Sequence, residues 1–151
     1  MRRTSSVIAS RADPQPLLLL DTHIWVWQMA GNRTLSPRTR RAIDEASIVG
    51  GLRLSVMTLW EIALLASRNR LQLGKPAAAW IADSLAPPGP RVEQLSEKIA
   101  IEAGELPGGF RSDPADQIIV ATARLTGATL LTRDRRILAY AEAGHLNAIA
   151  A

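Results

Sequence analysis

Four acidic residues of the chain lie beside the ends of predicted strands or near the start of predicted helices: Asp21, Glu61, Asp116 and Asp134. Asp21 directly follows the apolar run of residues 17–20, and Asp134 comes two residues after another predicted strand. Glu61 and Asp116 each fall near the beginning of a predicted helix. Because ligands of open parallel sheets bind beyond the carboxyl ends of the strands, we expect these side chains to meet at one edge.

A cluster of carboxylates requires a cation. Two carboxylates about 5 Å apart repel each other by roughly 3 kcal/mol at an effective dielectric constant of about 20. Ligands that are all oxygen suit Mg²⁺, with Mn²⁺ as the alternative. The only two histidines, His23 and His145, are too few and too far apart in sequence to suggest zinc. We therefore predict a metal site in which the four acids are the ligands.

Each acid also has a structural explanation. Asp113 is placed to cap the helix that Pro114 begins, and Asp116 then completes a capping box at the positive end of that helix. Asp134 is equally able to cap the helix that follows it, and Asp21 the helix after the first strand. Glu61 could face solvent, although it is the only charged residue in an apolar stretch and needs a partner if buried. Their joint placement favours a common site.

Other catalytic chemistries fit the sequence poorly. The chain has no cysteine, which excludes thiol nucleophiles, disulfides and cysteine-bound metals. No glycine-rich phosphate loop follows the first strand, and Ser55 lacks the flanking residues of a nucleophile elbow. His23 beside Asp21 could serve as a general base, but a lone histidine at a helix start is more often structural.

Hydroxyl and basic residues flank the predicted acidic site. Thr22 and Thr132 could orient carboxylates or water by hydrogen bonds, or could simply pack within a helix start and a strand. Three arginines follow the last of the predicted buried strands and could hold phosphate groups, or could form a solvated charged surface: Arg133, Arg135 and Arg136.

The elements that must position these residues alternate between strand and helix. The predicted strands are residues 17–20, 52–56, 91–95, 128–132 and a final one near 146–149. The predicted helices are residues 22–29, 36–46, 58–67, 77–85, 96–106, 113–127 and one beginning at 135. Such alternation predicts an α/β fold in three layers, α/β/α, around a central parallel sheet.

The length of 151 residues is that of a single domain. We predict a flexible N-terminal tail at residues 1–16, which are rich in arginine and serine, followed by one domain over residues 17–151. No apolar run is long enough for a membrane span. A net charge of +4 is too small to establish nucleic-acid binding by itself, and the absence of cysteine fits a reducing, cytoplasmic location.

Five motifs together resemble one known family: LLLLDTH at 17–23, LSP at 35–37, SVMTLWEIA at 55–63, DPAD at 113–116 and LLTRD at 130–134. They look like the PIN-domain ribonucleases, and within them they are most similar to VapC toxins of type II toxin–antitoxin modules. The resemblance covers about residues 17–150. It implies that Asp21, Glu61, Asp116 and Asp134 form the metal site of the family, while Gln117 departs from the arginine of many relatives.

The resemblance implies Mg²⁺-dependent hydrolysis of RNA phosphodiester bonds by a cytoplasmic toxin. It also implies a small VapB-like antitoxin as partner, which covers an apolar groove, and a homodimeric toxin. Trp25, Trp27 or Trp60 could line such a groove, or they could belong to the core, as we expect for Trp60. Two other classes stay open at this stage. One is a non-catalytic PIN-like module that binds nucleic acid or a partner protein, and the other is a metal-dependent phosphatase.

Overall fold

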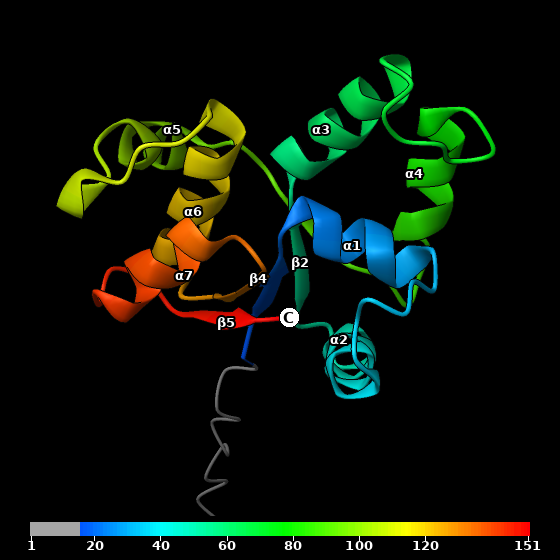
Figure 1. Ribbon diagram of the computed structural model, residues 1–151, viewed down its shortest axis with the longest axis horizontal. Coiled ribbons are helices and arrows are strands. Elements are labelled where there is room, and N and C mark those ends of the chain that lie inside the picture. Colours follow the sequence, from blue (N-terminus) through cyan, green and yellow to red (C-terminus); the bar gives the residue numbers. More distant parts are fainter. Residues whose placement is uncertain (1–15) are drawn as a thin grey trace, which may run out of the picture.

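The computed structural model describes residues 16–151 (Figure 1). The strands are β1 (Leu18–Leu20), β2 (Leu52–Ser55), β3 (Arg91–Glu93), β4 (Thr129–Thr132) and β5 (Ala148–Ala150). The helices are α1 (Thr22–Met29), α2 (Pro37–Ile48), α3 (Val56–Ser67), α4 (Ala77–Leu85), α5 (Glu97–Gly104), α6 (Pro114–Thr126) and α7 (Arg135–Glu142). The tail predicted for residues 1–16 lies outside the described residues, except for Pro16.

The five strands form one parallel sheet in the order β3-β2-β1-β4-β5. The chain first builds outward from β1 to β3 and then returns to the other side of β1 for β4 and β5. The strand order therefore reverses between β1 and β4, where Leu20 is in register with Leu131. Such a reversal leaves a crevice at the carboxyl ends of the two strands, because their connections leave on opposite sides.

Helices cover both faces of the sheet, as the α/β/α prediction requires (Figure 1). Leu20 packs with residues of α1, α2 and α3, whereas its neighbour Leu19 packs with α6 and α7 on the opposite face. Both leucines are fully buried. A strand between two helical layers needs apolar residues at every position, which explains the uninterrupted leucine run.

Local capping signals fix where several elements begin. Ser36 accepts a hydrogen bond from the amide of Thr39, and proline follows it at the first position of α2. The second strand is shorter than predicted, because the Ser55 hydroxyl accepts the Met57 amide and α3 starts directly at Val56. The strand predicted for residues 91–95 ends at Glu93.

The segment after α5 also differs from the prediction. The helix expected to continue to residue 106 ends at Gly104, and a 3-10 turn follows at Pro107–Gly109. Proline at the start of this turn cannot continue the preceding hydrogen-bond ladder. Across residues 16–151, none of the helices has the length and apolar character needed to cross a bilayer.

Candidate active site

The four predicted site residues line a single cleft at the carboxyl edge of the sheet. Asp21 follows β1, Glu61 lies on α3, Asp116 is in the first turn of α6, and Asp134 precedes α7. The cleft has a volume of about 310 Å³ and is lined by Asp21, Thr22, His23, Ile24, Trp27, Glu61, Asp113, Asp116, Arg133 and Asp134. The acidic residues thus lie where the strand order reverses, at the carboxyl ends of β1 and β4.

Asp21 is held by two donors from different elements. Its Oδ1 accepts the backbone amide of Thr22 at 2.8 Å and so caps α1. Its Oδ2 accepts a hydrogen bond from the Thr132 hydroxyl at 2.7 Å, which comes from the end of β4. The capping role and the placement in the cleft are therefore compatible. The orienting role expected for Thr132 is present in the structure.

Glu61 reaches the cleft from α3 and is half-buried. The Thr22 hydroxyl donates to its Oε1 at 2.7 Å, and the same hydroxyl lies 3.1 Å from that of Thr58. Burial raises the pKa of Glu61, and the nearby negative charges of Asp116 and Asp21 raise the pKa further. The bond from Thr22 acts in the opposite direction. Glu61 therefore does not belong to a solvated stripe.

The start of α6 presents two acids with different roles. Asp113 is exposed, and its Oδ1 accepts the amide of Asp116 at 2.9 Å, as expected for the helix cap. Asp116 turns toward the cleft, and its Oδ2 accepts a hydrogen bond from the Ser112 hydroxyl at 2.7 Å. Burial raises the pKa of Asp116, and the charges of Asp113, Asp21 and Asp134 add to this effect.

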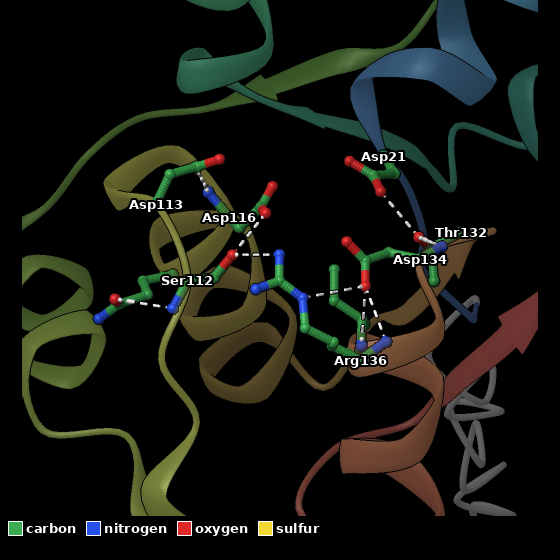
Figure 2. A network of polar contacts seen from close by, with 9 residues as sticks. Asp21, Ser112, Asp113, Asp116, Thr132, Asp134 and Arg136 are labelled. Atoms are coloured by element: carbon green, nitrogen blue, oxygen red, sulfur yellow. Dashed lines mark hydrogen bonds and ion pairs between the residues drawn. The ribbon is translucent and has the colours of Figure 1, made fainter.

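Asp134 caps α7 through its Oδ1, which accepts the amides of Arg136 and Ile137 at 2.8 and 3.2 Å. The amide of Asp134 donates to the Thr132 hydroxyl at 3.0 Å, so Thr132 touches both Asp21 and Asp134. Figure 2 shows the guanidinium of Arg136 between Asp134 and Ser112. Its Nη2 donates to the Ser112 hydroxyl at 3.1 Å.

Ser112 is a site residue that the sequence did not predict, and Gln117, noted there only for its departure from arginine, supports it. The Gln117 side chain accepts the Ser112 amide at 3.3 Å and donates to the Ala103 carbonyl at 2.8 Å. An amide can do both because it carries a donor and an acceptor. Gln117 thereby ties the loop before α6 to α5, and this loop places the Ser112 hydroxyl on Asp116. A serine four residues before the acid is too weak a signal to find this contact.

The acids share a cleft without converging on one point. Among residues 16–151, no three histidine, aspartate or glutamate side chains stand close enough together to hold a metal ion as they are placed. The carboxylates are nevertheless close enough to interact electrostatically, since the charge of Asp21 contributes to the raised pKa of both Glu61 and Asp116. Their oxygens are the hard donors that a divalent cation prefers, and the donor set fits such an ion.

The protein is thus a three-layer α/β/α protein with an acidic cleft at the point where the strand order reverses. The sequence matches the PIN domain family over residues 18–143, and the chain belongs to this family. It is 35% identical to Ribonuclease VapC22 of Mycobacterium tuberculosis over 123 residues, which are 82% of this chain and 91% of that protein. The resemblance to VapC-type members is thus confirmed. Ribonucleases of the family generally depend on a divalent metal.

Solved structures share the fold at low sequence identity. VapBC2 from Rickettsia felis, bound to a DNA fragment from its promoter, is 18% identical with a TM-score of 0.67, over 89% of this chain and 98% of that chain. A toxin–antitoxin complex from Klebsiella pneumoniae is 22% identical with a TM-score of 0.54, over 78% and 86% of the two chains. These likenesses confirm the predicted PIN-like fold.

Proposed function

We propose that this chain is a Mg²⁺-dependent endoribonuclease that acts as the toxin of a type II toxin–antitoxin module. The observation that carries the proposal is the cleft between the ends of β1 and β4, which is lined by acids from four separate parts of the chain. Further support comes from the relative named as a ribonuclease and from the fold of a toxin–antitoxin complex.

Asp21, Glu61 and Asp116 would hold the cation, with Asp134 completing the site directly or through water. Hydroxyl donors already fix one oxygen of each of the first three acids: Thr132 on Asp21, Thr22 on Glu61 and Ser112 on Asp116. These bonds limit the rotation of each carboxylate, and the second oxygen of Asp21 also accepts the Thr22 amide. Binding then requires the side chains to move closer together, which mutual repulsion opposes when no cation is bound.

Bound Mg²⁺ would supply Lewis acidity and a water of lowered pKa for attack on phosphorus. The chain contributes orientation and charge. Arg136 is largely exposed at the mouth of the cleft, where its guanidinium is able to pair with a phosphate group. Arg135, the preceding residue, is also exposed. The chemistry proposed is therefore hydrolysis of RNA with the substrate held through its phosphates.

The test is cleavage of RNA by the purified full chain in the presence of Mg²⁺. We expect cleavage that stops on addition of EDTA and returns with excess Mg²⁺. Release of inorganic phosphate from a phosphomonoester, without RNA cleavage, would indicate a phosphatase. RNA binding without cleavage under any metal condition would indicate a non-catalytic module. Mapping the 5′ ends of transcripts after brief expression identifies the RNA that is cut.

The partner proposed is a small antitoxin that places an arginine among the acids and covers nearby apolar surface. Of the tryptophans considered for this surface, Trp25 is buried in the core and Trp27 lines the cleft. Trp60 is not in the core as expected but is 53% exposed on α3. We expect expression of this chain alone to arrest growth, and the neighbouring small open reading frame to restore growth and co-purify. Light scattering on the purified chain tests the proposed homodimer. Harmless expression of folded protein would contradict the toxin role.

A further inference from the structure

One wall of the acidic cleft is aromatic. His23 and Trp27 lie one turn apart on α1, and their rings stack with centroids 6.2 Å apart and planes inclined by 28°. His23 is exposed, while Trp27 is half-buried with part of its surface against the core. Both line the same cleft as the four acids. Two ring-bearing side chains thus line the cleft together with the carboxylates.

Arg133 extends this aromatic wall. Its guanidinium carbon lies 5.3 Å from the centre of the Trp27 ring, in a cation–π contact. Its Nη2 donates to the Thr34 carbonyl at 2.6 Å and its Nε to the Ala151 carbonyl at 3.0 Å. These bonds use the guanidinium edge, so Arg133 is a poorer phosphate ligand than the sequence suggested. They also hold the planar group rigidly against Trp27.

We propose that His23, Trp27 and Arg133 form a stacking wall for an unpaired base of the nucleotide beside the cleaved phosphate. The inference rests on the proposed ribonuclease function. Aromatic rings and arginine planes bind bases by stacking, and a base is available for this only when it is not enclosed in a duplex. A cleft of about 310 Å³ lies at the small end of ligand sites, as one nucleotide requires.

The position of Trp27 separates this role from ordinary core packing. Trp25, on the same helix, is 4% exposed and belongs wholly to the core. Trp60 is exposed on α3 but does not line the cleft. Trp27 alone of these three residues has ring surface in the cleft. The three tryptophans therefore provide a set for comparison within one chain.

The experiment measures binding of a short fluorescein-labelled single-stranded RNA that contains the mapped cleavage site. The parent protein is the full chain with Asp116→Asn, which prevents cleavage during the measurement. Abasic nucleotides replace each residue of the RNA in turn. We expect one position next to the cleaved phosphate at which loss of the base weakens binding about tenfold, since stacking on one aromatic group is of that size.

The variants are Trp27→Leu and His23→Ala, with Trp60→Leu as the matched control. In either test variant, intact RNA should bind about tenfold more weakly, and the abasic nucleotide should cause little additional loss, because the ring it would have contacted is gone. In Trp60→Leu, removal of the base should still weaken RNA binding about tenfold, as in the parent protein. Circular dichroism checks folding, and the exposed His23 provides the test if Trp27→Leu does not fold.

Equal abasic effects in parent and test variants would overturn the stacking wall. So would intact RNA affinity in Trp27→Leu together with loss of antitoxin binding, which would make the wall a protein-binding surface. Tight binding of duplex RNA in preference to single strands would also contradict it. These outcomes leave Mg²⁺-dependent cleavage by the wild-type chain unaffected, whereas absence of that cleavage would refute the proposed function itself.

Discussion

The acidic wall and the aromatic wall of the cleft are built on opposite energetic terms. Glu61 and Asp116 on the acidic wall are half-buried carboxylates whose pKa is raised by burial and by neighbouring negative charges, among them that of Asp21. Trp27 on the aromatic wall packs part of its ring on the core and part against Arg133. Gathering the acids destabilises the folded state through repulsion between like charges. Burying part of the tryptophan stabilises the folded state.

This difference shows which part of the cleft depends on a ligand for its stability. Each of three acids has a hydroxyl donor within 2.7 Å, from Thr22, Ser112 or Thr132, which offsets part of the repulsion. Charge-assisted bonds of this kind are roughly twice as strong as neutral ones. The remaining repulsion between the ionised acids is relieved by a cation or by a cationic partner. The aromatic wall needs neither.

The largest effect should follow removal of a charge from the acidic wall. We expect Asp116→Asn or Asp21→Asn to lower Mg²⁺-dependent RNA cleavage by about a hundredfold or more, as loss of a preorganised electrostatic group does. An amide is a poor ligand for a hard cation. Cleavage assays with matched circular dichroism measure this. Wild-type rates in both folded variants would rule out the assigned site, and Glu61→Gln should behave like them.

Metal binding should stabilise the acidic wall and leave the aromatic wall unchanged. A ligand at a hundredfold excess over its Kd adds about 2.7 kcal/mol, or roughly 5 to 10 °C in Tm for a domain of this size. We expect such a rise with Mg²⁺ or Mn²⁺, and its reversal by EDTA, in a thermal melt. Trp27→Leu should keep the full rise. A Tm insensitive to both ions would argue against a metal cluster.

Loss of a hydroxyl that orients an acid should have an intermediate effect. Ser112→Ala removes the donor to Asp116 and the acceptor for Arg136. We expect cleavage to fall about tenfold, the lower end of what such supporting partners contribute, with a raised Mg²⁺ requirement. The control is Ser67→Ala, whose hydroxyl donates to the Leu64 carbonyl far along α3. Identical metal dependence in Ser112→Ala and wild type would contradict the role of Ser112.

The cap of α6 should affect stability more than chemistry. Asp113→Ala removes the acceptor for the Asp116 amide, and loss of such a cap costs about 1 kcal/mol. We expect the Tm to fall by roughly 2 to 4 °C, while cleavage by the folded protein stays near the wild-type rate. A loss of activity as large as that of Asp116→Asn would place Asp113 among the metal ligands instead.

The smallest effect expected is a pH dependence of the metal-free protein. Because folding raises the pKa of Glu61 and Asp116, the folded state binds more protons than the unfolded state over the pH range between the two pKa values. Stability in EDTA should therefore fall as the pH rises from the ordinary carboxylate range through the folded values. Glu61→Gln should make the stability less dependent on pH and should raise the Tm at pH values above the pKa of Glu61 in the folded protein. An unchanged pH dependence of stability in this variant would show that the Glu61 carboxylate does not destabilise the metal-free protein.

Much of the fold follows from short local signals. The apolar runs before Asp21 and before Thr132 are buried on both faces, and the Ser36-Pro37 and Asp113-Pro114 pairs start helices where expected. The gathering of the four acids at one cleft could be predicted as well, because the carboxyl ends of parallel strands lie at one edge of the sheet. The start of α3 differs, because Ser55 caps the helix and α3 begins at Val56, two residues before the predicted start.

The supporting contacts could not be predicted in the same way. Ser112 meets Asp116 only because Gln117 ties the intervening loop to α5. Arg133 lies on Trp27 because the carbonyls of Thr34 and Ala151 orient it, and residues 34 and 133 are far apart in sequence. Such contacts depend on loop conformation and side-chain direction, which neither periodicity nor capping preference specifies.

The bond from Thr132 to Asp21 spans 111 residues of sequence and sets when the cleft comes into existence. A slip of one residue between β1 and β4 would turn the hydroxyl to the opposite face of the sheet. The pair therefore forms only after nearly the whole domain has been synthesised and β4 has entered in register. A chain still emerging from the ribosome carries Asp21 and Glu61 without the acids that complete their site. For a protein that cuts RNA, this order of assembly delays activity until most of the domain has been synthesised.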